Sequence, residues 1–397
     1  MSPHFDLTEA ASPRSSPRTP GIRGTAGSQR RGLSQRELAR ASKVSHSLIT
    51  KLEQGVVADT RMETARKLAA ALRVPTTTLV APPPAEPHPA PEPWQALQRA
   101  VERPAEQPDE EPTVRGVLDG LETVRAAHFG KRMREAVDLL VPLLRDAEAL
   151  GDSPAARTAR AQLLQIAGST LTGARQFAAA ETALRRALDE APDRLRAASV
   201  VTTWTWLLVR QGRFDAARAM AVKWADDAEP RMSRATAEEI AAWGWLLVQG
   251  HAAALRDNRG GEAADMLRLA RSAAVATGPL CHGDVRIATW GPATVAYKAA
   301  EQGVVTDRPD EVLKIAPRLK GGTGSEYHRH RLDVAKAYSM TRQHGRALEV
   351  LGEVAADAPE WIAEQPYARG TLADTIARRR TLTTEARQLA DLVGLPL

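Results

Sequence analysis

One stretch, Leu33 to Leu72, most constrains how this chain can fold, because helix start signals and apolar spacing recur along it. Ser34 precedes Glu37 by three residues, and this is the spacing of a capping box at the start of a helix. We therefore expect a helix that begins at Gln35 and has two residues on one apolar face, Leu38 and Ala41. The short break at 42–44 then turns the chain.

Two further helices follow in the same stretch. Ser45 can cap the first of them and Gly55 is a typical C-terminal stop, and its apolar residues repeat at helical spacing: Leu48, Ile49 and Leu52. Thr60 and Glu63 form another capping box, which begins a helix with a buried side made of Ala65, Leu68, Ala69 and Leu72. Two short helices joined by a tight break and followed by a supporting helix indicate the helix-turn-helix plan.

This stretch resembles the Xre, or phage-repressor-like, helix-turn-helix family in LSQxELA at 33–39, in Val44-Ser45, in Ile49, in Glu53-x-Gly55 and in LAxAL at 68–72. The resemblance implies that Gln35 contacts the DNA backbone. It also implies that five side chains face the major groove: Ser45, His46, Ser47, Thr50 and Lys51. Hydroxyl and imidazole groups can meet base edges, while Lys51 and Arg40 can neutralise phosphates.

Two features depart from that family. Its turn usually holds Gly, whereas this chain has Lys43, and a non-Gly residue at positive φ costs roughly 1 kcal/mol. The family has a firm first helix, whereas this chain places three glycines there, Gly21, Gly24 and Gly27. Each glycine costs on the order of 1 kcal/mol against Ala in a helix interior, so we expect a short or frayed first helix and a modest affinity for DNA.

The distribution of charge favours a nucleic-acid partner for this unit. Residues 1–80 hold 13 Lys and Arg against 6 Asp and Glu, whereas residues 81–397 hold 41 against 42. The basic surplus therefore lies where a polyanion would dock. A small three-helix bundle that binds a protein is the alternative interpretation of the same stretch, and the charge argues against it.

Composition sets the domain boundaries. Residues 1–20 lack periodicity and are rich in Pro, Ser, Thr and Arg, which predicts a disordered tail before a DNA-binding domain at 21–80. Residues 81–112 hold 10 prolines and seven acidic side chains, a composition typical of a semi-rigid linker. We therefore expect the DNA-binding domain to be tethered and not fused. Within the linker an amphipathic helix that docks on another surface is conceivable, but our interpretation is a solvated spacer around Trp94, Leu97 and Val101.

Residues 113–397 form a succession of helical patterns with internal repeats. The clearest unit resembles the tetratricopeptide repeat at nearly every signature position: Leu164, Ala167, Gly168, Leu171, Phe177, Ala180, Leu184, Ala187 and Pro192. Small residues at Gly168 and Ala180 let two antiparallel helices approach closely. Partial copies follow or precede it at Met133, Phe214 and His344. We expect about six helical hairpins in a right-handed solenoid over 113–397, closed by helices near 367–379 and 384–393.

A repeated tryptophan motif predicts a ligand groove. WTWLLVRQG at 204–212 recurs as WGWLLVQG at 243–250. The first tryptophan of each pair takes a seam position and would pack in the core, whereas the second lies about 200° around the helix. By resemblance to tetratricopeptide repeats, that position faces the concave surface. We expect a groove for a peptide or a small amphipathic ligand, lined by Trp206, Arg210, Glu238, Trp245, Tyr297 and Arg329. Burial of both tryptophans between hairpins or in a dimer interface is the alternative.

The sequence gives no pattern of an enzyme or a metal site. Cys281-His282-x-Asp284 lacks a second thiol or a suitably spaced histidine, and the glycines at 321–324 lack the Lys-Ser/Thr of a P-loop. His328 and His330 would point to different faces of a helix. We expect no catalytic residue, no metal and no cofactor. The lone cysteine and the lack of a long apolar run favour a cytoplasmic protein without a membrane partner.

The sequence therefore predicts an all-α transcription regulator that binds double-stranded DNA. We expect its tetratricopeptide-like domain to form a homodimer and to bind a peptide, small-molecule or protein signal. This layout is similar to that of the peptide-pheromone receptors of Gram-positive bacteria, which implies a bacterial regulator. The alternative is a tetratricopeptide interaction scaffold whose DNA binding has weakened.

Overall fold

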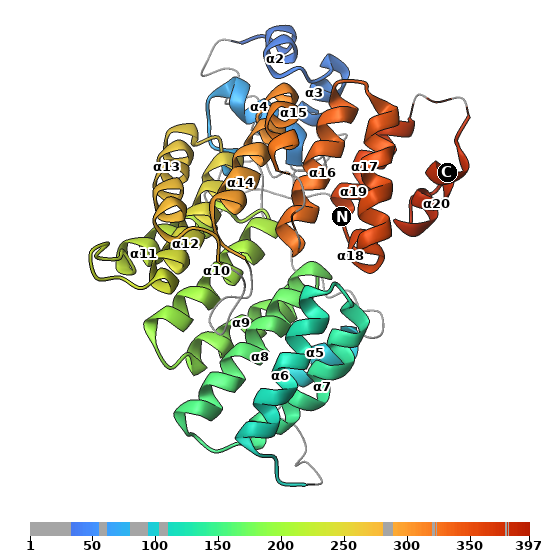
Figure 1. The fold of residues 1–397 in the computed structure, drawn as a ribbon. Coiled ribbons are helices and arrows are strands. Elements are labelled where there is room, and N and C mark those ends of the chain that lie inside the picture. Colours follow the sequence, from blue (N-terminus) through green and yellow to red (C-terminus); the bar gives the residue numbers. More distant parts are fainter. Residues whose placement is uncertain are drawn as a thin grey trace, which may run out of the picture.

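The structure, a computed structural model, describes residues 33–54, 62–79, 94–102, 110–280, 289–319, 322, 324–377, 379 and 381–397. In these residues every regular element is a helix, apart from one isolated antiparallel bridge between Leu280 and Trp290. The expected all-α class is confirmed. The expected tail at 1–20 and the glycine-rich first helix lie outside the described residues. Figure 1 shows a small group of helices, α2 to α4, in contact with a long series of paired helices.

The first group, which we call the N-terminal bundle, comprises α2 (Gln35–Ser42), α3 (His46–Glu53), α4 (Met62–Leu72) and the 3₁₀ turn η1 (Thr76–Thr78). The expected capping box begins α2, since the backbone N–H of Ser34 donates to Glu37 Oε2 at 2.8 Å and the Glu37 N–H donates to Ser34 Oγ at 3.3 Å. Ser45 caps α3 in the same manner, through Leu48 N–H at 3.3 Å. The expected stop at Gly55 and cap at Thr60 lie outside the described residues.

The core of the N-terminal bundle is apolar, as its sequence pattern predicts. It contains Leu38, Val44, Ile49, Leu52, Ala65, Leu68, Ala69, Leu72 and Leu79. The prediction is wrong for Ala41, which is exposed, because Ser42 takes the buried position. The hydroxyl of Ser42 donates to the Leu38 carbonyl at 2.6 Å, so its burial leaves no polar group unsatisfied. Lys43 adopts the left-handed conformation expected for the turn, with φ of 55°.

Paired helices make up most of the remaining chain. Each pair packs along its length and contacts the next pair. The pairs are α6 (Val114–Phe129) with α7 (Met133–Ala149), α8 (Pro154–Gly173) with α9 (Phe177–Glu190), α10 (Arg194–Arg210) with α11 (Phe214–Asp227), α12 (Ala237–Arg256) with α13 (Gly260–Thr277), α14 (Pro292–Val305) with α15 (Pro309–Ile315), and α16 (Gly324–Met340) with α17 (His344–Asp357).

The same turn joins the two helices of each of these pairs. One residue in every turn has positive φ: Lys131, Arg175, Gly212, Asn258, Asp307 and Arg342. The next residue donates its N–H to a carbonyl five positions back, as Arg213 does to Leu208 at 2.9 Å and Arg259 does to Ala254 at 2.9 Å. This is the Schellman pattern, which ends a helix by satisfying its last carbonyls. The recurring turn gives each pair the same reversal of direction.

Small residues set the spacing within pairs. A Cβ added to Gly168 would lie 2.6 Å from Leu184 Cγ, so α8 and α9 meet at a distance that only glycine permits at this position. Gly244 of α12 makes room for a residue outside its own pair, since a Cβ added there would lie 2.1 Å from the indole of Trp290. The predicted close approach at Gly168 is therefore confirmed, and Ala180 on the facing helix is fully buried, as expected.

The segment around Trp94 is a helix and not a solvated spacer. α5 (Trp94–Glu102) buries Trp94, Leu97 and Val101 against α7, α8 and α9. The carbonyl of Val101 accepts a hydrogen bond from Arg186 Nη1 at 2.7 Å, which satisfies one of the last carbonyls of the helix. Our interpretation of this part of the linker is wrong because the amphipathic spacing finds a complementary apolar surface. The rest of the predicted linker, apart from residues 110–112, lies outside the described residues.

Short helices close the chain after α17: α18 (Pro359–Ala363), α19 (Pro366–Ile376) and α20 (Thr384–Leu392). Another short element, the 3₁₀ turn η2 (Ala316–Arg318), lies earlier, between α15 and α16. α19 and α20 match the two closing helices expected from the sequence to within a few residues. They cover the apolar side of α16 and α17 through Ala368, Leu372, Leu389 and Val393. In the part of the chain that the structure describes, no helix is long and apolar enough to span a bilayer.

Candidate nucleic-acid interface

The face of α3 that points away from the core carries four polar side chains. Ile49 and Leu52 are buried inside the N-terminal bundle. Residues four apart on a helix lie one above the other, so a single outward strip holds His46, Ser47, Thr50 and Lys51, which are exposed or half-exposed. A helix with this polarity, presented by a second short helix, has the form that enters a major groove.

Gln35 joins the start of α2 to this strip. Its amide nitrogen donates to Glu53 and its amide oxygen accepts from Thr50 Oγ1 at 3.2 Å. The same hydroxyl lies 3.0 Å from the His46 carbonyl. Because a hydroxyl has one proton, Thr50 gives it to the bundle. It can offer DNA an acceptor and a methyl group, but no donor.

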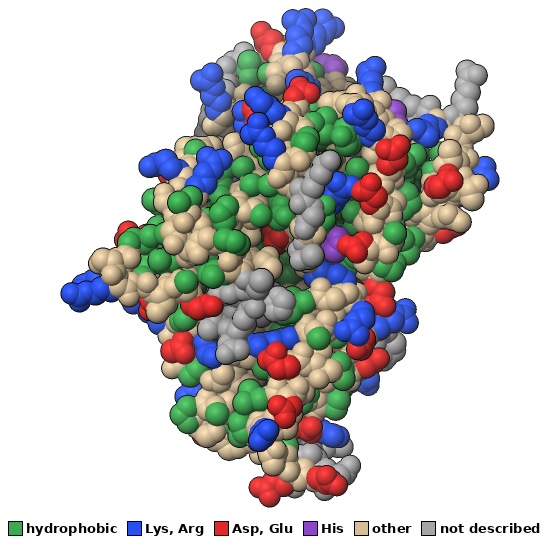
Figure 2. All heavy atoms as spheres, viewed as in Figure 1, with side chains coloured by type: hydrophobic (Ala, Val, Ile, Leu, Met, Phe, Trp, Pro, Cys, Tyr) green, Lys and Arg blue, Asp and Glu red, His purple; other side chains and the backbone are tan. Residues whose placement is uncertain are grey.

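Positive charge lies within and beside the outward strip. Lys51, a member of the strip, lies in the last turn of α3 and Arg40 lies in the last turn of α2, and both are exposed. Ser45 is exposed as well, but its hydroxyl caps α3. Figure 2 shows Lys and Arg side chains gathered at the end of the molecule where α2 and α3 lie. Cations beside a polar helix face are the arrangement in which phosphate contacts position a protein on a duplex.

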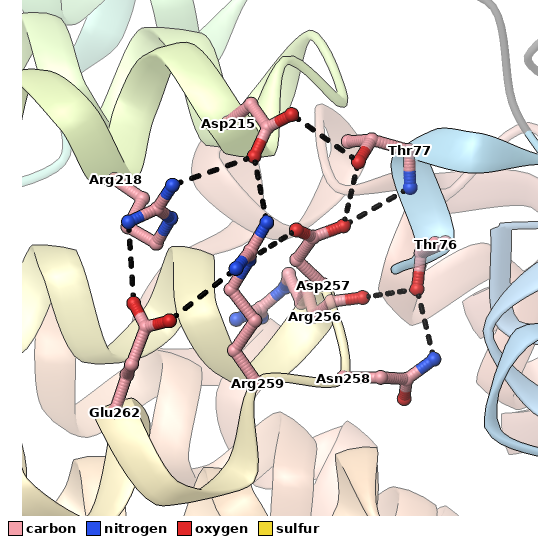
Figure 3. A network of polar contacts seen from close by, with 9 residues as sticks. All are labelled: Thr76, Thr77, Asp215, Arg218, Arg256, Asp257, Asn258, Arg259 and Glu262. Atoms are coloured by element: carbon pink, nitrogen blue, oxygen red, sulfur yellow. Dashed lines mark hydrogen bonds and ion pairs between the residues drawn. The ribbon is translucent and has the colours of Figure 1, made fainter. Parts of the chain in front are cut away.

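The N-terminal bundle is held against the paired helices through η1 (Figure 3). Asp257 Oδ1 accepts the Thr77 N–H at 3.0 Å and the Thr77 hydroxyl at 2.9 Å. The Thr76 hydroxyl donates to the Arg256 carbonyl at 2.7 Å and accepts from Asn258 Nδ2 at 3.2 Å. Thr76 is fully buried. The turn between α12 and α13 is therefore the docking site for the end of the bundle.

Asp257 is the centre of this contact. Its side chain has no exposed surface, and Arg259 Nε lies 2.9 Å from its second carboxylate oxygen. Arg259 also reaches Glu262 at 3.3 Å and Asp215 at 3.5 Å. A buried carboxylate needs hydrogen bonds to offset its lost hydration. The Thr77 groups supply two of them, so undocking the bundle would expose or orphan this oxygen.

A second contact joins the turn of the bundle to the turn between α14 and α15. Asp307 lies 3.2 Å from Lys43 Nζ and 3.8 Å from Lys67 Nζ. Burial opposes ionisation of Asp307, but Lys67 and Lys43 hold its pKa below the usual value. Lys43 is largely exposed, so this pair contributes on the order of 0–1 kcal/mol.

These contacts contradict the expectation that the DNA-binding unit is tethered and not fused. Besides the polar network, the Met62 methyl group lies within 2.9 Å of a Cβ added to Gly212, at the turn between α10 and α11. The bundle therefore rests on three successive interhelical turns. A high proline content is typical of a linker. It carries no information on whether the parts of the chain on either side of that linker have complementary surfaces.

The expected groove residues separate into two groups. Trp206, Arg210 and Arg329 line one cavity of about 390 Å³. Arg210 lies over the Trp206 ring at 6.0 Å from its centroid, and Arg329 lies over the Tyr367 ring at 4.3 Å. The cavity is bounded by α8, α10, α12, α14 and α16, and Met62 of the N-terminal bundle belongs to its wall.

Trp245, Tyr297 and Glu238 do not line this cavity. Trp245 is buried against Trp290, with ring centroids 5.9 Å apart. Tyr297 is buried and stacks on His330 at 4.9 Å. Glu238 lies in the first turn of α12, whereas the cavity is lined by residues near the last turn of that helix. The structure does not bring these three residues together with Trp206, because later parts of the chain cover Trp245 and Tyr297 and Glu238 lies at the far end of α12.

The two histidines of α16 meet different partners, as their spacing predicts. His328 Nε2 contacts Asp357 and its ring lies 5.5 Å from Trp361, whereas His330 stacks on Tyr297. Both histidines are buried. The segment Cys281-His282-x-Asp284 lies outside the described residues. Elsewhere, the described residues contain no group of three or more His, Cys, Asp or Glu arranged to hold a metal ion.

Residues 29–79 match the model of a known family, described as helix-turn-helix (HTH_3). The chain carries a helix-turn-helix domain. This is a family of DNA-binding regulators and not of enzymes, so the match supports a DNA-binding regulator. The match ends at Leu79, just after η1, so it covers the N-terminal bundle and none of the paired helices. No curated protein matches the chain.

Sequence reasoning missed the residues that hold the helix-turn-helix domain in place. Asp257, Asn258 and Thr77 belong to turns, and each is of a residue type common in turns for local reasons. No pattern in the sequence marks this turn, because the position of Asn258 is held by Lys, Arg, Gly or Asp in the other turns and the burial of Asp257 is known only from the structure.

Proposed function

We propose that this protein is a sequence-specific transcription regulator in which α3 enters the major groove of double-stranded DNA. The observation that carries the proposal is the outward strip of α3, where four polar side chains stand opposite the buried Ile49 and Leu52. The strip, which includes Lys51, is positioned by Gln35 at the start of α2 and has Arg40 of α2 beside it. His46 and Ser47 would contact base edges, and Lys51, Arg40 and Gln35 would contact phosphates.

Thr50 and Ser45 have narrower roles in this proposal. Thr50 donates its proton within the helix-turn-helix domain, so it would contact a thymine methyl group or accept from a base amino group. The Ser45 hydroxyl caps α3. It would therefore act mainly by fixing the start of the helix that carries His46 and Ser47.

We further propose that the paired helices form a tetratricopeptide-like solenoid that binds a signal. Support comes from the recurring Schellman turn and from the close approach at Gly168. A cavity bordered by both parts of the chain gives the signal a place to act. Stacked helical pairs bury a continuous core and leave an extended inner surface for ligands.

A homodimer is part of the same proposal. One small helix-turn-helix domain buries too little surface for tight specific binding, so two recognition helices roughly 34 Å apart on one face of DNA are the expected solution. The paired helices are the part of the chain large enough to join two copies. Because the helix-turn-helix domain rests on them, the dimer contact would set the distance between half-sites.

The experiment that tests the proposal is selection of bound duplexes from a random library by the full chain. Enrichment of a two-fold symmetric motif, with half-sites separated by about one helical turn, is the expected result. The matched control is the same selection with Lys51→Ala and His46→Ala combined, which should enrich no motif. A full chain that enriches nothing would instead support the interaction scaffold with weakened DNA binding.

A further inference from the structure

The cavity beside Trp206 has the size of a small-molecule site. Its volume is about 390 Å³, which lies within the range of roughly 300–1,000 Å³ for pockets that hold such ligands. Its walls come from several helix pairs, and Met62 adds a contribution from the helix-turn-helix domain. A molecule in it would contact both parts of the chain.

The charges on the cavity wall do not balance. Its lining holds two carboxylates, Glu301 and Glu326, against six cations: Lys131, Arg175, Arg210, Arg256, Lys298 and Arg329. Both carboxylates are already paired, Glu301 with Arg256 and with Lys298 at 3.4 Å, and Glu326 with Lys298 at 2.9 Å. Arg329 pairs with Asp333 at 4.0 Å, outside the lining. The remaining cations, Lys131, Arg175 and Arg210, therefore create a positive potential inside a partly enclosed space.

Arg210 is the cation with the least compensation. Its Nη2 atom is inaccessible to solvent and has no hydrogen-bond partner among the described residues. Burial, together with the charges of Arg329, Arg175 and Arg256, lowers the pKa of Arg210 to about 9. The guanidinium is still charged at neutral pH. An unpaired buried charge is costly, so the site favours any anion that can reach this group.

Apolar surface lies directly beside Arg210. The Trp206 ring faces the guanidinium at 6.0 Å, and Phe177, Met62 and Val209 line the same cavity. An inorganic ion would use the charge but would leave this surface in contact with water. A ligand with both an acidic group and an apolar body would use both.

We propose that this cavity binds a small organic anion, with its acidic group on Arg210 and its apolar body against Trp206 and Phe177. The inference rests on the proposed signal-binding function and names the class of the signal as a carboxylate, sulfonate or phosphate on an apolar body.

The same cavity reaches the helix-turn-helix domain by two routes. Met62 is the first residue of α4 and part of the cavity wall. Arg256 points its side chain to Glu301 in the cavity, while its carbonyl accepts the Thr76 hydroxyl of η1. An anion that attracts Arg256 or displaces Met62 acts directly on the contact that orients the helix-turn-helix domain.

Two matched dyes test the proposal without DNA. 8-Anilinonaphthalene-1-sulfonate carries a sulfonate on an aromatic body, and N-phenyl-1-naphthylamine is the same body without the charge. Both gain fluorescence on binding, so each can be titrated against the full chain. We expect Arg210→Gln to weaken binding of the sulfonate by about tenfold or more, because a charge-assisted contact is lost. Binding of the neutral dye should change by less than about twofold, since its apolar contacts remain.

Three further variants make the outcome decisive. Arg210→Lys keeps the charge but not the planar group over Trp206, so it should weaken binding of the sulfonate less than Arg210→Gln does. Trp206→Ala should weaken both dyes several-fold, because both use the ring. Arg185→Gln, on the exposed side of α9, should change neither. Helical content measured by circular dichroism checks that each variant is folded.

The proposal is overturned if the parent binds neither dye, or if Arg210→Gln binds the sulfonate as tightly as the parent does. A chain that binds the sulfonate through Arg210 but selects no DNA motif would retain this inference and lose the proposed function. A chain that selects a motif but fails the dye titration would do the reverse.

Discussion

At the residue scale, Lys51 and His46 should separate affinity from specificity. Lys51→Ala should weaken binding to all sequences and reduce the slope of log affinity against log salt by about 1, because one phosphate contact and its released counterions are lost. His46→Ala should leave that slope unchanged and cost about 1–3 kcal/mol of discrimination at particular base pairs. Fluorescence anisotropy with selected and scrambled duplexes at several salt concentrations measures both quantities. Equal losses on both duplexes for both variants would argue against α3 as the reading helix.

His128 should make the stability of the fold depend on pH. Burial lowers its pKa to about 3, with a further contribution from Lys131, and its Nδ1 lies 3.2 Å from the Thr170 hydroxyl. The folded protein keeps this imidazole neutral, whereas the unfolded chain takes up a proton as the pH falls below about 6.5. Stability is therefore fully present above that pH and is lost progressively toward the folded pKa. At about pH 5 the loss is roughly 2 kcal/mol.

The variant His128→Gln isolates this effect, because Gln can keep a hydrogen bond to Thr170 without titrating. Chemical unfolding at about pH 7.5 and about pH 5 should show a smaller drop in stability for the variant than for the parent. Other carboxylates and histidines titrate in both proteins, so the difference between the two drops is the informative quantity. Equal drops would mean that His128 is protonated inside the folded protein.

The two Trp-x-Trp motifs show what residue spacing can and cannot predict. Trp206 and Trp245 occupy the same position in equivalent helices, yet Trp206 borders a cavity and Trp245 is buried. The difference comes from Trp290, which follows α13 and fills the space over Trp245, where Gly244 makes room for its ring. Helix register defines the inner face correctly. It cannot predict which part of that face a later segment covers.

At the element scale, two glycines of α8 give opposite expectations. Gly168→Ala should destabilise the fold by about 1–3 kcal/mol, because its new Cβ would meet Leu184 Cγ at 2.6 Å and push α9 away. Gly173→Ala, at the end of the same helix, meets nothing within 4 Å. It should be neutral or stabilise by up to about 1 kcal/mol through its higher helix propensity. Thermal unfolding of the two variants provides the comparison. If both behave alike, the close approach of α8 and α9 is not limiting.

Most helices of this chain could be predicted because their signals are local. Ser34 with Glu37, and the spacing of Leu38, Ile49 and Leu68, depend only on neighbours in sequence, and the structure contains each of these features. The helix at Trp94 shows where local evidence fails. Its apolar spacing was visible, but whether it docks depends on a groove made by α7, α8 and α9. The proline-rich flanks favoured the interpretation as a solvated spacer, which is wrong. Composition describes the segment itself and not the surface against which it packs.

At the scale of the whole molecule, the helix-turn-helix domain and the paired helices form one assembly through contacts between turns. Thr76 and Thr77 meet the turn that follows α12, and Lys43 meets the turn that follows α14. These groups have no periodicity that a sequence pattern could reveal. The recurring Schellman turn presents a row of similar loops, and single residues such as Asp257 make one of them a docking point. The position of α3 is thereby coupled to the packing of the paired helices, including the cavity that Met62 and Arg256 border.

Asp257 should therefore decide whether the helix-turn-helix domain stays docked. Asp257→Ala removes the acceptor for the Thr77 N–H and hydroxyl, and hydrogen bonds to a charged group contribute about 1.5–3 kcal/mol each. We expect hydrogen exchange of the Thr77 amide and of α4 to become at least tenfold faster, while α8 and α9 keep their protection.

Asp265→Ala removes an exposed carboxylate from the next helix, where it pairs with Arg268 at 2.6 Å, and should change neither region. Thr77→Val removes only the hydroxyl contact and should fall between the two. Unchanged exchange in Asp257→Ala would mean that the apolar contact of Met62 with the turn at Gly212 is sufficient to hold the domain. Selective loosening would instead show that the contact of Asp257 with Thr77 holds the helix-turn-helix domain against the paired helices.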